Sequence, residues 1–423
     1  MIRLLNIAVV LFLIWFLNAS FQQEQINSIS ATEIVGTENT PDFYSEKLEI
    51  RQYNEEGSLA SYITTERLSH YLDSHSVDGS SLDKESLDRQ NIKSNNVDEH
   101  KTNNQYALLD APSVLIYGKD GGTKKITSTN GLLTERNHDL KLSNDVVLLV
   151  SDKNDNQTLK VTTTELSYND VEDRIWTDKE IIGNSEQATF NSNKLQLDVK
   201  SEQLNLKDKV KIHYDKYGLD ISADALSSNP LTELSRLNGN VLLSHVKILI
   251  TGKSAEVKTT KSKQQQQFII SGAPVNFQQI LEQSTMFAKA NHLVYIPSSE
   301  QMEFEGNVVI TQRSVDVEFE VAAEQLQLLF QDQKPSQLIA EGSPVKFKHK
   351  IAERIIYIDA KHMLWQSTTK MAILSQATVQ DGETIFSADE IQYNTLTGEI
   401  SATGNGNSRP SYKYKPEEEK GSN

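Results

Sequence analysis

Apolar residues recur at every second position along most of the chain. The alternation is clear at Val308 and Ile310 and again at Val345 and Phe347, and Thr, Val, Ile and Tyr are plentiful in such runs. Gly, Asn and Pro fall between the runs. A period of two between turn residues is typical of β-strands, because successive side chains of a strand point to opposite faces. The pattern predicts an all-β chain.

The predicted strands belong to a repeat, whose loose motif is a small residue, two variable residues, an apolar residue, a variable residue and an aromatic or apolar residue. It occurs as "TERLSH" from Thr65, "TTELSY" from Thr163, "SNKLQL" from Ser192, "ADALSS" from Ala223, "ANHLVY" from Ala290, "AEQLQL" from Ala323, "AKHMLW" from Ala360 and "ADEIQY" from Ala388. A period of roughly thirty residues indicates a stacked architecture. We expect each unit to hold two antiparallel strands, so that the stack is elongated and has one sheet on each side of a narrow interior.

Turn signals lie between the copies of the motif. The segments "NGNVLL" and "EGNVVI", from Asn238 and Glu305, predict a turn followed by a strand. Two similar segments contain Pro274 and Pro344. We expect both prolines at strand starts, where a missing N–H group is tolerated.

Some segments depart from the repeat. An apolar run after Arg3 indicates either a cleaved signal peptide or an uncleaved anchor. The cleavage site around Ala19 is poor, because Leu17 stands where a small residue is needed, so we expect one N-terminal transmembrane helix over residues 1–20, followed by a linker over residues 21–40. The rest of the chain is then expected on the exported side of the membrane. Residues 73–105 and 412–423 are almost wholly polar, which predicts a disordered insertion and a disordered tail.

Composition excludes several classes of function. The chain has 423 residues, with 58 acidic against 42 basic residues and a net charge of −16. This balance disfavours nucleic acid as a partner, because binding phosphates requires a basic face. The chain has no cysteine, and its 9 histidines are scattered without metal-ligand spacing. Since no nucleophile, phosphate-loop or dinucleotide motif is present either, we expect no catalytic residue, no metal and no cofactor.

The inward apolar residues leave two interpretations open. They form either a filled core, as in an ordinary β-sandwich, or the lining of a groove. The set mixes large side chains such as Tyr295 and Trp365 with small ones such as Val275, as a deformable groove would. No capping helix is evident at either end of the predicted stack, which also favours a groove.

Two stretches of the chain resemble known families. The segment "PDFYSEKLEIRQYNEEGSLASYITTERLSHY", residues 41–71, resembles the LptC family, the membrane-anchored component of lipopolysaccharide export. The resemblance continues through residues 111–133, 140–150 and 159–214. It predicts an LptC-like domain over residues 41–216.

The second half of the chain is similar to a different family. Residues 217–411 resemble the periplasmic LptA or OstA-like domain, with "NGNVLL", "SGAPVNF" and "EGNVVITQ" as its usual strand openings. The chain therefore looks like an LptC-type protein fused to an LptA-type protein.

The resemblance implies a fold and a function. The family fold is a twisted antiparallel β-jellyroll, open at both ends, whose apolar interior carries the acyl chains of lipid A. The implied partners are lipopolysaccharide, the permeases of the inner-membrane ABC transporter, and an LptA-type protein or outer-membrane LptD-type protein, which join by pairing edge strands. The implied location is the inner membrane, with one span and most of the chain in the periplasm.

The resemblance and the period-two spacing together predict the residues that line the lipid-binding groove. They are Leu166, Tyr168, Val241, Leu243, Val275, Phe277, Leu293, Tyr295, Val308, Ile310, Val345, Phe347, Met363, Trp365, Ile391 and Tyr393. Two alternatives remain, a β-repeat enzyme that acts on envelope polysaccharide and a structural spacer with a filled core.

Overall fold

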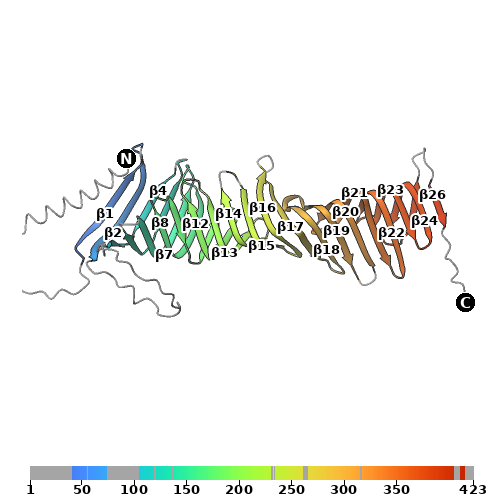
Figure 1. Cartoon of the computed structure of the whole chain (residues 1–423), viewed down its shortest axis with the longest axis horizontal. Coiled ribbons are helices and arrows are strands. Elements are labelled where there is room, and N and C mark those ends of the chain that lie inside the picture. The colour runs from blue at the N-terminus through green and yellow to red at the C-terminus, as the bar shows by residue number, and fades with distance from the viewer. Residues whose placement is uncertain are drawn as a thin grey trace, which may run out of the picture. The chain divides into compact units, whose positions relative to one another are not determined.

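The computed structural model describes residues 41–54, 56–73, 104–118, 121–134, 138–229, 232, 234–260, 265–314, 317–403 and 410–414. Most of these residues lie in strands (Figure 1), and the strands pair in antiparallel ladders. The predicted all-β antiparallel fold is therefore confirmed. The predicted anchor at residues 1–20 and linker at 21–40 lie outside the described residues. Within the described residues, no helix has the length and apolar character that crossing a membrane requires.

The chain divides into two compact units, Met1–Glu186 with Gln196–Lys200, and Gln187–Leu195 with Ser201–Asn423. The strands of the first unit are β1 (Phe43–Tyr53), β2 (Leu59–Asp73), β3 (Asn104–Asp110), β4 (Ser113–Tyr117), β5 (Thr123–Thr127), β6 (Asn130–Thr134), β7 (Asp139–Ser151), β8 (Gln157–Asn169), β9 (Arg174–Thr177) and β10 (Ile181–Ser185). One of the points at which the chain passes from one unit to the other lies within β12 (Lys194–Asp198). The domain boundary at residue 216 was drawn from sequence resemblance and stays a prediction.

The second unit consists of long strands and one short 3-10 helix, η1 (Pro297–Ser299). Its strands are β11 (Thr189–Ser192), β13 (Leu204–Tyr214), β14 (Leu219–Asn229), β15 (Leu234–His245), β16 (Ile248–Thr260), β17 (Gln265–Ile280), β18 (Thr285–Ile296), β19 (Gln301–Arg313), β20 (Val317–Gln331), β21 (Lys334–Ile351), β22 (Arg354–Gln366), β23 (Met371–Asp381), β24 (Thr384–Asn394), β25 (Ile400–Thr403) and β26 (Ser411–Tyr414).

The predicted disordered segments overlap strands at their ends. β2 extends to Asp73, β3 begins at Asn104, and β26 includes the first residues of the predicted tail. The expected boundaries are wrong by a few residues, because backbone pairing extends into polar sequence that side-chain pattern alone does not reveal. The remaining parts of both segments lie outside the described residues.

Each long strand of the second unit bends near its middle. The ladder between β15 and β16, for example, shifts register between Asn238 and Val241. A register shift of this kind marks a β-bulge, which bends the strand. At the bends of β15 and β19 the backbone is left-handed at Gly239 (φ 75°) and Gly306 (φ 76°). Glycine adopts this conformation readily because it has no Cβ.

The bends coincide with the segments that the sequence predicted to be turns between strands or strand starts. Gly239 and Gly306 lie inside β15 and β19, and Pro274 and Pro344 lie inside β17 and β21. The expectation of a turn and of a strand start was therefore wrong at these positions. Glycine and proline mark a bulge within a strand as well as a turn between strands.

The repeated sequence motif arises at the same bends. Ala290 and Leu293 of β18 are both buried although they are three residues apart, and so are Ala360 and Met363 of β22. A regular strand buries residues two apart. The spacing of three therefore means that the bulge shifts the phase of the strand and keeps one face inward on both sides of the bend.

We call the two sides of the bends arm I and arm II. Arm I contains residues 241–245 of β15 and 285–290 of β18, and arm II contains residues 234–238 and 292–296 of the same strands. The other long strands up to β22 divide in the same way at their register shifts, and β23 and β24 divide by their pairing with β22.

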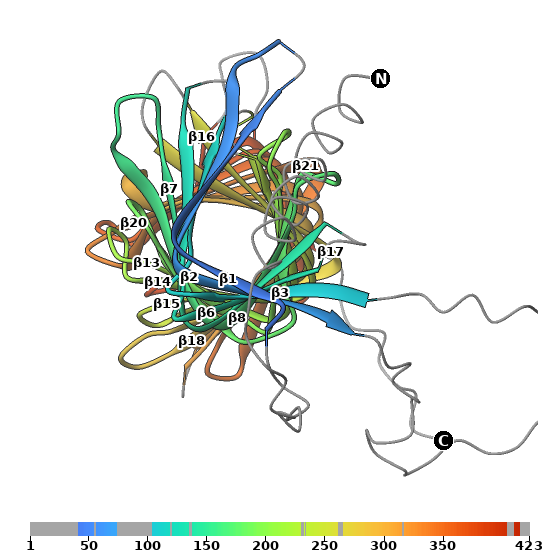
Figure 2. The same cartoon turned by 90° about the vertical axis from the view of Figure 1, so that its left-hand side faces the viewer.

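The inner surfaces of the two arms face each other. Met286 and Tyr295 lie on opposite arms of β18, and a straight strand would hold them ~30 Å apart. Met286 belongs to the same cross-strand row as His245, through Gln279 and Ile248. The Tyr295 hydroxyl nevertheless lies 2.8 Å from His245 Nδ1. The strand therefore folds back at its bend, in agreement with the curved ribbons of Figure 2.

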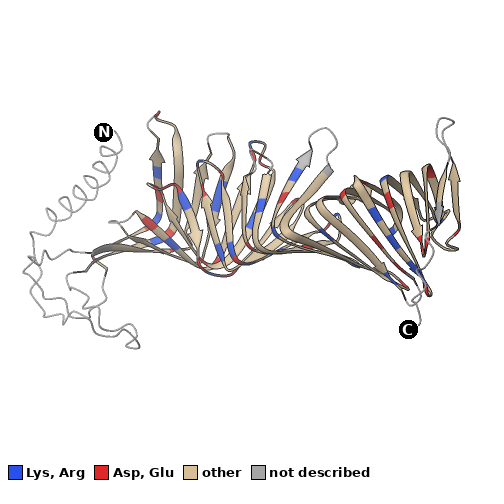
Figure 3. Cartoon of the chain, turned by 45° about the vertical axis from the view of Figure 1, so that its right-hand side comes forward, with Lys and Arg blue, Asp and Glu red and all other residues tan. Residues whose placement is uncertain are grey.

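Charged residues occupy the outer face. In β19, Glu303 and Glu305 are exposed and alternate with the buried Met302 and Phe304. Figure 3 shows acidic and basic residues distributed along the strands of both units. The alternation thus separates a charged outer surface from an apolar inner surface.

The bend at Gly239 provides a test of this architecture. A Cβ added at Gly239 would lie 2.9 Å from Asp224 Cβ, whereas one added at Gly382 (φ 58°) would meet no atom within 4 Å. Both alanine variants incur the cost of a left-handed residue, about 1–2 kcal/mol. We expect Gly239→Ala to lose about 1 kcal/mol more than Gly382→Ala in urea unfolding, because it also crowds the bend. Equal losses would show that the bend is not sterically constrained.

Candidate functional site

The inner surface of the second unit is built from rows of residues that pair across successive strands. The middle row of arm I consists of Ile212, Ile221, Leu243, Ile250, Phe277, Ala288, Ile310, Val321, Phe347, Ile358, Val379 and Phe386. The row of arm II nearest the bends consists of Leu206, Leu226, Leu237, Ala255, Ile270, Leu293, Phe304, Leu326, Ala340, Met363, Leu374 and Ile391. Both rows run from β13 to β24, and neither contains a polar side chain.

The predicted groove residues lie on these inner surfaces. All of them except Trp365 are buried. Trp365 is half-buried, and its indole N–H donates a hydrogen bond to Thr395 Oγ1 at 3.2 Å. Leu166 and Tyr168 belong to the first unit, where they pair with Leu142 and Leu140 of β7. The other predicted residues lie on the inner surfaces of the second unit, where all of them except Trp365 are shielded from solvent.

Small residues line the interior next to the bends. Ala290 pairs with Val275, and Ala360 pairs with Val345, where the two arms converge. Ala290 and Ala360 are the first residues of two copies of the repeated motif. Small side chains therefore fit where the two arms are close together at the bends, and larger side chains occupy the space farther from the bends.

Aromatic side chains fill the interior between β20 and β24. The Phe347 ring centroid lies 5.7 Å from that of Tyr393 and 6.3 Å from that of Phe319. The Phe319 centroid lies 6.5 Å from that of Trp365. These rings come from both arms, so aromatic contacts join the two inner surfaces.

A histidine and a tyrosine place polar atoms within this aromatic cluster. His349 Nδ1 lies 2.6 Å from the Tyr393 hydroxyl oxygen, and both side chains are buried. Burial lowers the pKa of His349 from 6.5 to about 4. Burial also raises the pKa of Tyr393 well above its ordinary value. Both groups are therefore neutral at pH 7, as desolvation favours.

Sequence reasoning missed the inward polar residues. His349 follows Phe347 by two positions, and Gln279 follows Phe277 by two positions. The same period of two that places the phenylalanines inward therefore also places His349 and Gln279 inward. The signal was present, but only apolar residues were assigned to the interior.

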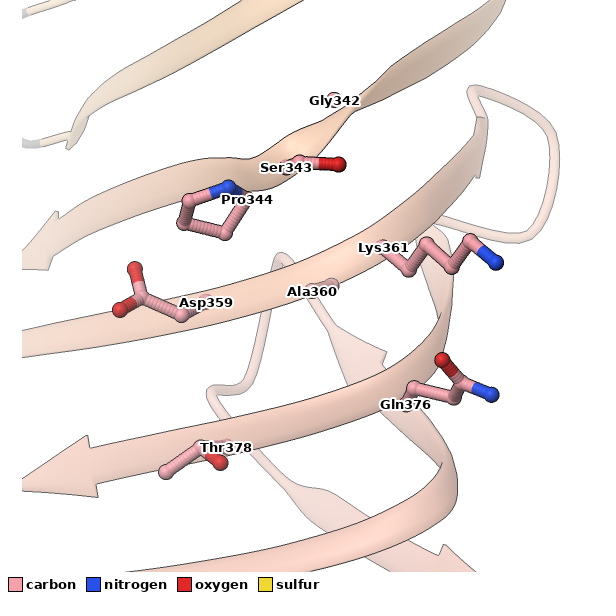
Figure 4. Close-up of a pocket in the computed structure, with 8 residues that line it drawn as sticks. All are labelled: Gly342, Ser343, Pro344, Asp359, Ala360, Lys361, Gln376 and Thr378. Carbon is pink, nitrogen blue, oxygen red and sulfur yellow. The ribbon is translucent and has the colours of Figure 1, made fainter.

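A shallow depression of about 300 Å³ lies on strands β21 to β23 (Figure 4). Its lining includes Asp359, Lys361, Gln376 and Thr378. These polar side chains make it unsuitable for an apolar ligand. Within the described residues, no group of His, Asp and Glu side chains is placed to hold a metal ion.

Two family models match successive parts of the chain. Residues 7–215 match a family described as lipopolysaccharide-assembly, LptC-related. Residues 220–318 and 289–399 match a family described as the LptA/(LptD N-terminal domain) LPS transport protein. These matches confirm both resemblances inferred from the sequence.

Comparisons with individual proteins add little to these matches. A comparison with curated proteins finds no match. The crystal structure of LptH from Pseudomonas aeruginosa, described as the LptA homologous periplasmic component of the conserved lipopolysaccharide transport device, is 17% identical over 31% of this chain and 95% of that chain, with a TM-score of 0.28. This similarity is too weak to support a conclusion.

The buried His349 predicts a pH dependence of stability. Its pKa in the folded protein, about 4, lies below the ordinary value of 6.5, so the unfolded chain binds the additional proton between these pH values. The stability contributed by neutral His349 is therefore complete above about pH 6.5 and decreases as the pH falls towards 4. We expect the thermal unfolding midpoint to fall over this interval and His349→Gln to flatten the profile.

The control for this measurement is His292→Gln, because His292 is exposed on β18. It should reproduce the wild-type profile. Asp381 lies two strands away from His349 in the same row and pairs with Arg354. An unchanged slope in His349→Gln would assign the pH dependence to groups other than His349.

Proposed function

We propose that this chain, which joins an LptC-related segment to an LptA/LptD N-terminal-type segment, carries lipopolysaccharide across the periplasm by shielding its acyl chains inside its β-stack. The first segment would receive the lipid from the inner-membrane ABC transporter, and the second would pass it towards the outer membrane. The N-terminal residues 1–20 would anchor the chain in the inner membrane with one span. Neither role requires a catalytic residue, a metal or a cofactor.

The continuous apolar rows of the second unit carry this proposal. A ligand that moves from β13 to β24 would meet apolar side chains at each strand of both rows. An enzyme pocket, in contrast, gathers a few polar groups at one place. Uninterrupted apolar lining over many strands suits a ligand that travels along the stack.

Transfer free energies explain why shielding is useful. Moving one methylene group from an apolar environment to water costs about 0.8 kcal/mol. A lipid with several acyl chains would therefore meet a barrier of tens of kcal/mol if it crossed water unshielded. An apolar interior removes most of this barrier without chemistry of its own. The energy for directional movement would come from the ABC transporter.

The closed interior supports a second candidate function. Leu293, Ile310 and Val345 are fully buried, as they would be in a structural spacer with a filled core. Under the lipid-carrier proposal, the same interior must open when acyl chains enter. A probe inside the interior therefore separates the two functions.

The terminal strands support docking at both ends of the chain. Among the described strands, β1 forms a ladder only with β2, and β25 and β26 form ladders only with β24. Tyr44 on β1 and Tyr412 on β26 are 61% and 70% exposed. Unpaired edges of this kind accept an additional strand. We propose that β1 pairs with the jellyroll domain of the permease, and that β25 and β26 pair with an LptA-type or LptD-type domain.

A photo-crosslinking residue at Phe277 tests the lipid-carrier proposal. Phe277 is buried in the middle row of arm I, whereas its neighbour Asn276 is exposed. In cells that synthesise lipopolysaccharide, we expect a crosslinked lipopolysaccharide adduct from position 277 and none from position 276. Equal labelling from both positions, or labelling from neither, would contradict the proposed lining.

Proline substitutions test the two docking edges. Ile50→Pro in β1 is expected to abolish binding to the permease and to leave the second unit folded, because proline removes a backbone donor and bends the strand. At the other end the edge is shared by β25 and β26. Ile400→Pro should therefore weaken binding to the outer-membrane partner, and the double variant Ile400→Pro/Tyr412→Pro should abolish it.

Pull-down of each partner from detergent-solubilised membranes measures these effects. Each set of substitutions should affect one partner only. Loss of both partners in a folded Ile50→Pro variant would rule out a two-ended bridge.

A further inference from the structure

A row of alternating polar and apolar residues borders the interior of the second unit on arm I, at the side away from the bends. We call it the rim row. It consists of Tyr214, Leu219, His245, Ile248, Gln279, Met286, Gln312, Phe319, His349, Ile356 and Asp381. The polar members lie on every second strand, and the adjacent row of arm I is wholly apolar.

Polar members of the rim row contact the opposite arm. His245 Nδ1 lies 2.8 Å from the hydroxyl oxygen of Tyr295, and His349 Nδ1 lies 2.6 Å from that of Tyr393. Both tyrosines are on arm II. These hydrogen bonds span the mouth of the interior, which is the side opposite the bends.

Gln279 makes a third contact of this kind. Its Nε2 donates a hydrogen bond to the backbone oxygen of Gln333 at 2.8 Å. Gln333 lies in the turn between β20 and β21, at the end of arm II. Successive contacts along the rim row thus hold the two arms together at the mouth.

The first unit has a comparable contact. Gln52 of β1 donates a hydrogen bond from Nε2 to Asp170 Oδ2 at 2.9 Å, and Asp170 follows the end of β8. Gln52 occupies a row with Ser61 and Ile116, which lies next to the apolar row of Ile50. In both units, therefore, a polar side chain near the end of one strand forms a hydrogen bond with a residue near the end of a strand that is not its ladder partner.

The contacts of the second unit leave hydrogen-bonding capacity unused. His349 Nε2 and Gln279 Oε1 are buried and have no hydrogen-bond partner among the described residues. Both side chains are 1% exposed. Buried polar atoms without partners are rare, because desolvation without a hydrogen bond is costly. A ligand with polar groups at the mouth would supply the missing partners.

A lipid with a large sugar head cannot place that head in the interior. The interior rows are apolar, and burying sugar hydroxyls among them would leave these hydroxyls without hydrogen bonds. Only the acyl chains fit inside, so the head must remain at the mouth. Entry from the side then requires the two arms to separate where the rim contacts join them.

On these grounds, and on the premise that the interior carries lipopolysaccharide, we propose that the rim row is a lateral gate and head-group site. The hydrogen bonds from His245, Gln279 and His349 to arm II close the empty interior. During loading, hydroxyl and phosphate oxygens of the lipid head replace the arm II partners and bond to the imidazole and amide groups. The acyl chains then occupy the apolar rows behind the gate.

A reversible crosslink between the arms tests this proposal. The chain contains no cysteine, so Gln279→Cys/Gln333→Cys can be bridged by a short bifunctional methanethiosulfonate reagent and released by a reducing agent. The 423-residue chain would carry a photo-crosslinking residue at Phe277 and be exposed to purified lipopolysaccharide with a short sugar chain. The matched control is Thr251→Cys/Asn276→Cys, which bridges two paired strands within arm I.

We expect the bridge between the arms to abolish lipid capture and reduction of the same sample to restore it. The control bridge should leave capture unchanged. Full capture by the protein bridged between its arms would overturn the gate and leave the carrier function intact. If the protein that carries the photo-crosslinking residue at position 277, without introduced cysteines, captures no lipid, both the carrier function and the gate are overturned.

Removal of the tyrosine hydroxyls provides a second measurement. Tyr295→Phe and Tyr393→Phe each delete one hydrogen bond across the mouth, so the initial rate of capture should rise about fivefold for each hydroxyl removed. Tyr357→Phe, at an exposed residue of β22, is the control and should not change the rate. An unchanged rate in the double variant would show that these contacts do not limit entry.

Discussion

Every long strand of the second unit must keep one face inward on both sides of a bend, and the rest of the structure depends on this constraint. In a straight strand, strict alternation is sufficient. In a strand that folds back, the alternation of inward and outward residues must shift by one residue at the bend. Without this shift, one arm would turn its charged face inward. The bulges accomplish this, since Ala290 and Leu293 are both buried at a spacing of three. A change of one residue in the bulge would exchange the inner and outer faces of a whole arm.

The interior, its mouth and the free edges follow from the bend. The vertex brings alanine against valine, the middle rows are apolar, and the rims come close enough for side chains to meet across the mouth. In the second unit consecutive strands pair from β13 to β24, and among the described strands β26 pairs only with β24, as β1 of the first unit pairs only with β2. The same geometry therefore provides an apolar path, a side that can open, and ends that can accept another strand. The two matching families are described by lipopolysaccharide assembly and by LPS transport.

The sequence predicted the class of the fold and the inward apolar residues because period two is a local property. Phe277 and Val345 were assigned correctly to a buried face. It did not predict the bends, because glycine and proline have the same preference for a bulge as for a turn, so Gly239 and Pro274 were placed between strands. It also missed the rim contacts, since the pairing of His349 with Tyr393 joins strands whose approach depends on the bend. Whether an apolar interior is a filled core or a closed groove depends on the free energy of opening, which is not a property of local pattern.

The central claim is that this closed interior opens to hold acyl chains. Native mass spectrometry of the 423-residue chain, released in mild detergent from cells that make lipopolysaccharide, tests it most directly. The account predicts species heavier than the protein by the mass of one or more lipopolysaccharide molecules. It also predicts that these species disappear in Ala288→Trp, where a large side chain fills the middle row of arm I, and circular dichroism checks that this variant is folded. Only the mass of the bare protein, or bound lipid that persists in Ala288→Trp, would contradict the account.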